Sequence, residues 1–445
     1  MQTVRHFFPD FNAWLEELPD PRHPDRTVYE ARFLLWTALM LFVCKLGSRR
    51  QIDYQFGEAG TQVLANLNRL AGTQQTTMPV NRTVDNYLAG VGCPPLAGLR
   101  RHLLYRLIRG RVLDGARLQG RFVVLIDGTG YLVFRQRHCD YCLTRRCGEA
   151  TLYLHQVLEA KLVGPAGMVL SIATEFIDNR DAADTPAEAG EERRKQDCEL
   201  KALRRLAARL RQDFPQLPVC VSGDGLHACG EGFQIARDYN LAFVHVFKPG
   251  RLPALWRDFQ ALLALCPDQR VEVRTPQGVR QEFRWVNGLD YQDSDGRRWR
   301  LNALACAETH PDGAQGSWAW LTGLEVTARG VAEVAAAGGR QRWCIENQGF
   351  NVQKNSGLNL EHAYSAGAHW AAYYCLLQIA HVLLQLLEKG SLLRRLAQEQ
   401  GKGSALALFG SLKNMAERLL ESLRNLWWPE EAFAPARLQI RFDSS

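Results

Sequence analysis

The pattern of apolar and polar positions separates a helical first part of the chain from a strand-rich middle. Up to about residue 115, apolar residues recur at helical spacing in Ala31–Leu46, Val63–Leu70 and Leu96–Leu113. Alternation typical of strands does not occur there, and prolines interrupt the helical pattern. The pattern therefore predicts a helical N-terminal domain over residues 1–115.

The pattern changes at Phe122, where short continuous apolar runs begin. Phe122–Ile126 and Pro218–Ser222 are runs of this kind, which are typical of strands buried on both faces of a sheet. Leucines at helical spacing predict an amphipathic helix over Lys195–Phe214. Further strands are predicted over Tyr153–Leu162, Met168–Phe176 and Ala242–Phe247. Strands that alternate with helices indicate an α/β fold for residues 116–264.

The last part of the chain returns to β-structure and then to helices. Residues 265–326 contain apolar or alternating runs separated by turn signals, which predicts a β-rich insertion. Helical spacing follows in Arg340–Lys354 and again in Ala366–Leu387. We expect residues 327–362 to complete the α/β core and residues 363–445 to form a helical C-terminal region.

Composition and charge agree with a globular protein and permit a nucleic-acid partner. Hydrophobic residues make up 46% of the 445 residues and charged residues 23%, which excludes collagen-like and disordered chains. The formal net charge of +7 favours a nucleic-acid partner without proving one. Two helical stretches carry runs of arginine, each of which either faces solvent or contacts phosphate. The runs are Arg100, Arg101, Arg106, Arg109 and Arg111, and Arg204, Arg205, Arg209 and Arg211.

The apolar stretches favour a cytoplasmic protein with no membrane partner. Met1–Asp20 contains charge and proline but no apolar core of a signal peptide. Ala371–Leu387 is interrupted by Gln378, His381 and Gln385, so a buried helix is the better interpretation than a membrane span. In such a compartment the twelve cysteines are expected to be reduced thiols or metal ligands rather than disulfides.

Two aspartates stand at the ends of predicted buried strands. Asp127 follows Phe122–Ile126 directly, and Asp224 follows Val219–Gly223. A carboxylate buried there is costly unless it is paired or binds a metal, and glycine after each acid permits a sharp exit from the strand. One such motif is usually a simple turn. Functional groups gather at the carboxyl ends of strands in an open sheet. Two strand–Asp–Gly motifs therefore predict a cluster of acidic side chains at that edge of the sheet.

A third acid, Glu346, lies on a predicted helix. Arg342 is four residues earlier and shares its face, which by itself indicates an ordinary salt bridge. Packing of this helix on the sheet is expected to bury Trp343 and Phe350 and to turn Glu346 toward the two aspartates. Carboxylates suit Mg²⁺ or Mn²⁺, and two such ions about 3.5–4 Å apart support phosphoryl transfer. Three close carboxylates repel, so at least one should have a raised pKa.

These residues resemble a known family. The segment Arg342–Asn351, with Lys354-Asn355 and Leu360–His362 after it, is similar to the signature region of the DDE transposases of bacterial insertion sequences, in the group with a Tyr-Arg-Glu-Lys signature. Lys195–Glu199, followed by a helix and by Pro218–Asp224, is also similar to that family. The resemblance covers about residues 120–385.

The resemblance implies an RNase H-like catalytic domain, interrupted by the β-rich insertion, that cleaves DNA at element ends and joins the freed 3′-hydroxyl to target DNA. It implies Asp127, Asp224 and Glu346 as ligands of Mg²⁺ or Mn²⁺, and Arg342 as a contact to DNA phosphate. DNA ends and target DNA would be the partners, with a homodimer on DNA, a helical N-terminal domain that binds the ends, and a location at the bacterial nucleoid.

Two positions depart from the family signature. Gly339 stands where the signature has Tyr, and Gln353 occupies the slot of its Lys, with Lys354 one residue later. On an ideal helix Lys354 would point about 80° away from Glu346, although a local bulge would restore it. Lys354 and Lys248, which follows a predicted strand, are candidate DNA contacts; a solvated lysine is the alternative for Lys248.

A cysteine-rich loop follows the first predicted core strand. Cys139, Cys142 and Cys147, with His155 beyond them and His138 adjacent, are compatible with a structural Zn²⁺ site, and free thiols are the alternative.

The resemblance thus implies a DDE-type DNA transposase. The alternatives are an RNase H-like nuclease without strand transfer and a catalytically silent DNA-binding protein derived from a transposase.

Overall fold

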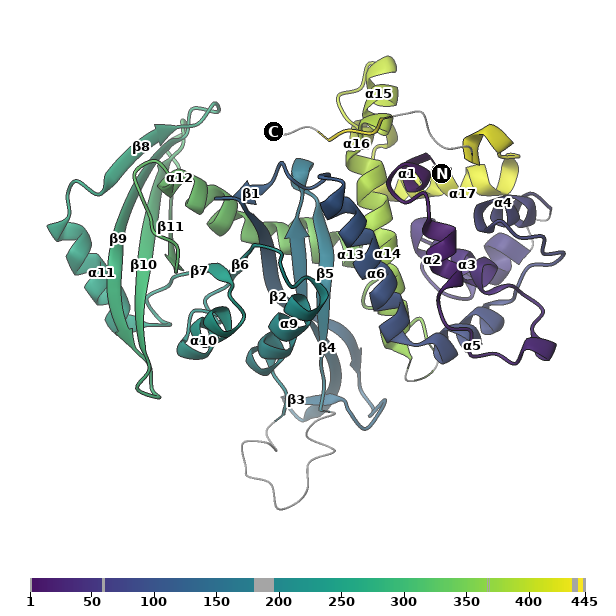
Figure 1. Cartoon of the computed structure of the whole chain (residues 1–445), viewed down its shortest axis with the longest axis horizontal. Helices are drawn as coiled ribbons and strands as arrows, with labels where there is room; N and C mark the ends of the chain where they lie inside the picture. The colour runs from purple at the N-terminus through teal and green to yellow at the C-terminus, as the bar shows by residue number, and fades with distance from the viewer. Residues whose placement is uncertain are drawn as a thin grey trace. The chain divides into compact units, whose positions relative to one another are not determined.

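The computed structural model describes residues 2–57, 61–179, 196–365, 367, 369–433 and 439–442. The chain combines a large mixed sheet with many helices (Figure 1). It divides into two compact units: unit 1 is Met1–Gly115, Gly164–Leu170 and Gln348–Ser445, and unit 2 is Ala116–Val163 and Ser171–Asn347. The predicted helical N-terminal and C-terminal regions therefore belong to one unit, because they share a core.

Unit 1 is built around a long apolar helix, α14 (Trp370–Lys389), which packs against α3 and α6. Its apolar stretch is long enough to cross a membrane, but 89% of that stretch is buried inside the protein. Gln378 and Gln385, which interrupt the stretch, hydrogen-bond within the core to Gln353 and to the backbone of Val169. The interpretation of this segment as a buried helix is confirmed.

The other helices of unit 1 agree in type with the predicted helical pattern. The N-terminal ones are α1 (Gln2–Phe7), α2 (Phe11–Glu16), α3 (Ala31–Val43), α4 (Thr61–Ala71), α5 (Asn81–Val91) and α6 (Cys93–Arg109). The C-terminal ones are α13 (Asn351–Asn355), α15 (Ser391–Glu399), α16 (Ala405–Phe409) and α17 (Leu412–Asn425).

Unit 2 contains most of a mixed sheet with the strand order β3-β4-β2-β6-β7-β11-β10-β9-β8, in which β1 also pairs with β2 and β5 with β4. The first strands are β1 (Arg117–Leu118), β2 (Arg121–Phe134), β3 (Leu143–Cys147), β4 (Ala150–Val163) and β5 (Val169–Ile177). The remaining strands are β6 (Val219–Gly223), β7 (Ala242–Val246), β8 (Arg270–Arg274), β9 (Arg280–Gln292), β10 (Arg298–Thr309) and β11 (Gln315–Thr322).

The centre of the sheet is parallel, and continuous apolar runs are typical of strands in such a sheet. Strand β6 is buried along its whole length and lies parallel to β2 and to β7. In the β2–β6 register, Leu125 lies opposite Ser222, so Asp127 and Asp224 stand two residues further along neighbouring strands. The register thus brings both aspartates to the same level of the sheet.

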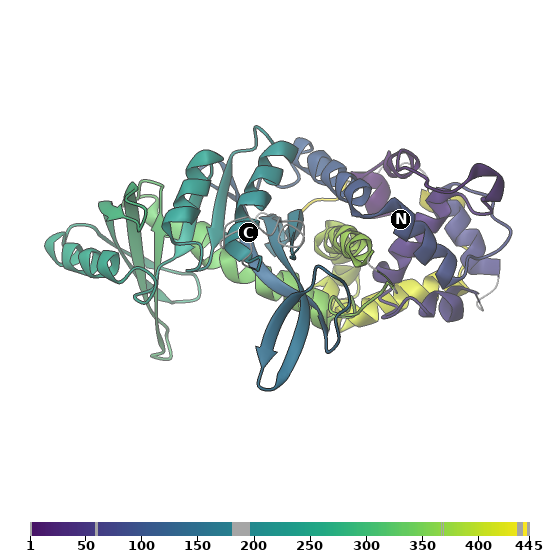
Figure 2. The same cartoon turned by 90° about the horizontal axis from the view of Figure 1, so that it is seen from below.

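The sequence predicts that the first core strand ends just before Asp127. In the structure, strand β2 instead continues to Phe134 beside β4. Gly128 and Gly130 weaken the sequence pattern of a strand, yet the long partner β4 supplies backbone hydrogen bonds through the segment. Strand β3 is mostly exposed, and the β3–β4 hairpin projects from the sheet (Figure 2). Asp127 is therefore within a long strand rather than at its exit.

The β-rich segment of residues 265–326 extends the same sheet. Strand β11 pairs antiparallel with β7, with Trp320 opposite Val246, and β8–β10 continue outward from it (Figure 1). Helix α11 (Pro253–Leu265) packs against β9. The predicted strands are present, but they lengthen the central sheet instead of forming a separate body.

Helices α9 (Glu199–Asp213) and α10 (Gly230–Asp238) contact each other and precede β6 and β7. The amphipathic pattern predicts α9 well, although its expected first residue, Lys195, lies outside the described residues. Short helix α12 (Val331–Glu333) leads into the segment that carries Glu346.

The segment that carries Glu346 is not the single helix that its sequence predicts. It consists of π-helical turns at Val334–Gly339 and Ile345–Phe350, with a 3-10 turn at Arg340–Arg342 between them, followed by α13. Gly339 lies so close to the indole of Trp320 that a Cβ atom would clash with it. This contact explains why glycine stands in the position of the signature tyrosine.

Candidate active site

Four charged side chains meet where β2 and β6 lie side by side. Arg342 donates a hydrogen bond from Nη1 to Glu346 Oε1 at 2.8 Å, and its Nη2 lies 3.5 Å from Asp127 Oδ2. Its side chain is only 11% exposed. One guanidinium thus joins two acids that are more than two hundred positions apart in the sequence.

Asp224 belongs to the same electrostatic cluster. Its negative charge contributes to raising the pKa of Asp127, and the positive charge of Arg342 contributes to lowering that of Asp224. The structure therefore brings Asp127, Asp224 and Glu346 together, as the sequence predicts.

The environments of the two aspartates move their pKa values apart. Burial, helped by the charges of Glu346, Asp224 and Glu199, raises the pKa of Asp127 to about 6 against the pull of Arg342. The pKa of Asp127 is thus raised as expected, but burial is the leading cause and repulsion between the acids contributes less.

Asp224 behaves in the opposite way. Burial alone would raise its pKa, but His227 and the backbone N–H of Leu226, which donates to Oδ1 at 2.9 Å, outweigh burial and hold the pKa at about 2. Nδ1 of His227 lies 3.1 Å from Asp224 Oδ1. The site therefore presents one acid that is ionised at all ordinary pH values and one that titrates near pH 6.

Glu199, in the first turn of α9, is a fourth acid at this site. Its carboxylate fills the space beside Gly128, where a Cβ atom would clash with it. Burial, together with the charge of Asp224, raises its pKa, although His227 opposes this. The sequence pattern gives Glu199 no role, because the need for glycine at position 128 shows only when both positions are seen in space.

Two buried histidines lie behind Asp224 and were not singled out from the sequence. His227 and His245 have ring centroids 5.9 Å apart, and Gly223 leaves room for the Nδ1 atoms of both. Burial, with the charge of His227 second, lowers the pKa of His245 to about 3. The signal in the sequence is His227, three residues after Asp224, in position to reach its carboxylate.

The donor set fits a hard divalent cation. Asp127, Asp224, Glu346 and Glu199 offer only carboxylate oxygens, which Mg²⁺ and Mn²⁺ prefer. Asp127 and Glu346 are already arranged around one cationic group, the guanidinium of Arg342. The side chains of Asp224 and Glu346 are 38% and 39% exposed, so water and substrate can reach them.

Three other acids flank Glu346 in the sequence, and their side chains have other surroundings. Glu333 accepts a hydrogen bond from the backbone N–H of Gln119, Glu361 pairs with Lys354 at 2.7 Å, and Glu325 is exposed. Glu346 is the acid that Arg342 connects to Asp127.

The residues expected to contact DNA lie in different surroundings. Arg342 points at the acids instead of away from them, because two carboxylates compete for its guanidinium. Lys354 is engaged with Glu361, and Lys248 is exposed after β7. Gln353, in the slot of the signature lysine, is fully buried and donates to Gln378 at 2.8 Å. Trp343, expected to be buried, is 55% exposed, because the irregular turns bury Ile345 instead.

The two arginine runs differ sharply. In the second run, the side chains bond within unit 2: Arg204 pairs with Glu231 and Asp238, Arg205 and Arg209 pair with Glu175, and Arg211 donates to backbone carbonyls. In the first run, Arg106, Arg109 and Arg111 line a cavity of about 690 Å³ in unit 1, together with Arg441. Arg100 is buried. Arg106, Arg109 and Arg111 are therefore the members of the two runs that a phosphate in this cavity would meet.

Three members of the predicted zinc set lie together, and the fourth does not. Sγ of Cys139 and of Cys142 lie 3.5 and 3.4 Å from His155 Nε2. Cys147 is exposed at the far end of β3, opposite Ala150. His155 is five positions after Ala150 on β4, which is roughly 17 Å of extended strand. Cys147 is therefore wrong as a ligand of this group.

Comparison with known proteins assigns no family to the chain. No protein-family model matches the sequence, and no curated protein matches it. Among solved structures, the cryo-EM structure of a piggyBac transposase synaptic complex with hairpin DNA is similar with a TM-score of 0.38 and 10% identity. The similarity covers 98% of this chain and 82% of that one. At this level the likeness carries no functional argument.

Proposed function

We propose that this chain is a DDE-type DNA transposase of a bacterial insertion sequence, in which Asp127, Asp224 and Glu346 bind Mg²⁺ or Mn²⁺. The observation that carries the proposal is the cluster itself. Three carboxylates from distant parts of the sequence meet beside the parallel strands β2 and β6, and Arg342 holds two of them. Such a set of oxygen ligands suits metal-assisted phosphoryl transfer.

The strand order supports an RNase H-like catalytic domain. Strands β5, β4, β2, β6 and β7 are neighbours in this order, with β2, β6 and β7 parallel and β4 antiparallel to β2. Helices α9 and α10 follow β5 and β6 in the chain. The acids come from β2, from the end of β6 and from the helical segment after the sheet. In this proposal, the β-rich segment is an extension inserted before Glu346.

Bound metal ions would activate the attacking oxygen and stabilise the leaving one. The chain itself contributes a permanently ionised Asp224, held so by His227 and the Leu226 N–H, and an Asp127 whose proton is lost near pH 6. Glu199 adds a further carboxylate beside Gly128. Arg342 presents a planar fork of donors that suits a phosphate diester as well as it suits carboxylates.

The exposed ring of Trp343 supports a nucleic-acid substrate. The guanidinium of Arg342 lies 5.4 Å from its ring centroid. An arginine and an exposed indole at the rim of an acidic site suit phosphate binding and base stacking, respectively. We propose element ends and target DNA as partners, a homodimer on DNA, and a location in the bacterial cytoplasm at the nucleoid.

The test uses duplexes that carry the inverted repeats expected in the DNA that flanks the gene. One set is intact and reports cleavage, and the other is pre-cleaved with a free 3′-hydroxyl and reports joining to a supercoiled plasmid. We expect both reactions with Mg²⁺ and neither with Asp127→Asn, Asp224→Asn or Glu346→Gln. The matched controls are the exposed acids, as Asp258→Asn and Glu325→Gln, which should retain both reactions.

The same assay separates the alternatives. Cleavage without joining would replace the proposal by a nuclease of the same fold. Specific binding of the repeats without either reaction would indicate a silent DNA-binding protein.

A further inference from the structure

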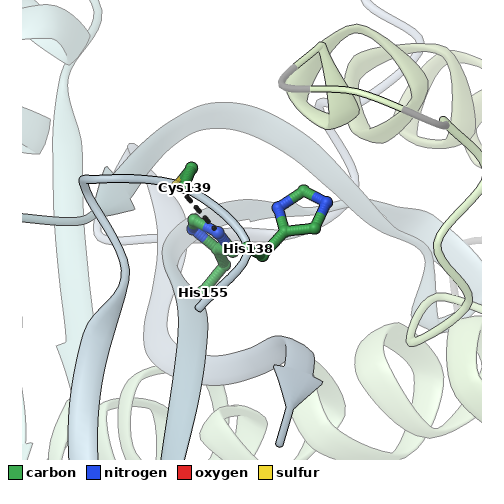
Figure 3. A group of neighbouring side chains, drawn as sticks. All are labelled: His138, Cys139 and His155. Carbon is green, nitrogen blue, oxygen red and sulfur yellow. Dashed lines mark hydrogen bonds between the residues drawn. The ribbon is translucent and has the colours of Figure 1, made fainter. Parts of the chain in front are cut away.

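A second cluster of metal-binding side chains lies in unit 2, in the loop between β2 and β3. His138 and Cys139 belong to this loop, and His155 faces them from β4 (Figure 3). Cys142 belongs to the same loop. The ligand atoms of His138, Cys139 and His155 all lie within 4.8 Å of one another. Cys142 joins them through contacts to Cys139 and to His155. None of these four residues belongs to the acidic site around Asp127.

The distances match the edges of a metal tetrahedron. The two sulfur atoms are 3.6 Å apart, and they lie 3.5 and 3.4 Å from His155 Nε2. With Zn–S bonds of about 2.3 Å and Zn–N bonds of about 2.0–2.1 Å, tetrahedral geometry requires separations of about 3.5–3.8 Å. Three donor atoms in mutual contact at these distances form one face of such a tetrahedron.

His138 is the fourth side chain of the group, with a ring nitrogen within 4.8 Å of the ligand atoms of Cys139 and His155. Its ring stacks on Phe134, with centroids 4.4 Å apart and planes at 5°, which restricts its orientation. Its Nδ1 atom is buried without a hydrogen-bond partner among the described residues. Figure 3 shows the ring beside the contact between Cys139 and His155. A buried, unpartnered nitrogen is costly, and coordination of a metal would satisfy it.

The surroundings suit a closed structural site. His155 is fully buried and Cys142 is 2% exposed. Two thiolates and two neutral imidazoles give a soft donor set that selects zinc over magnesium. Because three ligands come from a loop and one from the central part of β4, the metal would tie residues 135–142 to the sheet that carries Asp127.

We propose that Cys139, Cys142, His155 and His138 bind one structural zinc ion, with release of the two thiol protons. The site is independent of the proposed transposase activity, since its ligands and its readout are separate from the acids.

The experiment measures metal in the full chain purified without chelators. We expect about one zinc per chain in the wild type and in Cys147→Ser, which removes an exposed cysteine of the same hairpin. The double variant Cys139→Ser/Cys142→Ser should contain none. Replacement by Co²⁺ should give the visible absorption of a tetrahedral ion and a near-ultraviolet thiolate band in the first two proteins. His138→Gln should weaken zinc affinity more than about tenfold, since even outer-shell partners contribute 10–100-fold.

If the double variant does not fold, alkylation of the cysteine thiols in folded wild-type protein tests the same site. Zinc should protect Cys139 and Cys142 while Cys147 reacts. Wild-type protein without zinc and without a thiolate–cobalt band would overturn the proposal, as would a Cys139–Cys142 disulfide in place of the metal. Loss of zinc from Cys147→Ser would overturn the ligand assignment.

Discussion

The acidic cluster contains Asp127 of β2 and the Cys/His cluster contains His155 of the neighbouring strand β4, yet the two are built in opposite ways. Around Asp127 the donors are oxygens, two of the four main side chains are more than a third exposed, and Arg342 neutralises part of the charge. Around His155 the donors are sulfur and nitrogen, and the side chains of His155 and Cys142 are buried. The first arrangement permits exchange of ligands, as catalysis requires, and the second resists it.

The largest expected effect separates the two clusters by function. Asp127→Asn, Asp224→Asn and Glu346→Gln should each lower Mg²⁺-dependent DNA cleavage at least about 10³-fold, because a metal site that loses a ligand loses several kcal/mol of transition-state stabilisation. Binding of DNA ends should change little. Metal analysis of the same proteins should still find about one zinc per chain. Loss of zinc from an acid variant would show that the clusters are not independent.

Zinc removal should act on stability instead of chemistry. At free zinc a thousandfold above its Kd, the metal stabilises the folded state by about 4 kcal/mol. For a unit of 150–250 residues, this corresponds to roughly 8–16 °C in Tm. Calorimetry of Cys139→Ser/Cys142→Ser against Cys147→Ser measures the difference. Equal melting of the two variants would contradict a structural role.

The contrast also shows what sequence alone can predict. The strands that hold Asp127 and Asp224 are continuous apolar runs, so their burial and the meeting of their acids follow from pattern and topology. The extension of β2 through Gly128 and Gly130 does not, because β4 provides it. Glu199 and His227 were missed for the same reason: each acts on a neighbour that only the fold brings near.

The zinc ligands illustrate a different limit. Spacing identified Cys139, Cys142 and His155, but it favoured Cys147 over His138. Strand β3 carries Cys147 away from the group, whereas the stacking of His138 on Phe134 keeps that residue close. The direction of a short strand depends on its pairing with β4, which the cysteine spacing does not encode.

The acidic site should also show a pH signature that the zinc site lacks. The folded pKa of Asp127, about 6, is above its ordinary value of 3.8. Burial of the protonated carboxyl group therefore costs no stability below about pH 3.8. As the pH rises from there through about 6, the free energy of unfolding falls. A shift of two units corresponds to at most about 3 kcal/mol. Without added divalent metal, Asp127→Asn should melt above wild type at pH 7.5 and together with it near pH 4. A pH-independent difference would contradict the raised pKa.

The smallest expected effect concerns Arg342, which lies between the acids. Burial raises the pKa of Asp127 and the guanidinium lowers it, so Arg342→Gln should raise that pKa above about 6. If Asp127 must be ionised for cleavage, the acid limb of the pH–rate profile moves to higher pH. The variant should also lose a charge-assisted contact to phosphate, which costs about 10–100-fold in rate at the pH optimum. Arg342→Lys, which keeps the charge but not the planar fork, should restore the acid limb and not the rate. An acid limb that is the same in all three proteins would show that the arginine acts on DNA alone, and that its place between Asp127 and Glu346 has no bearing on proton binding.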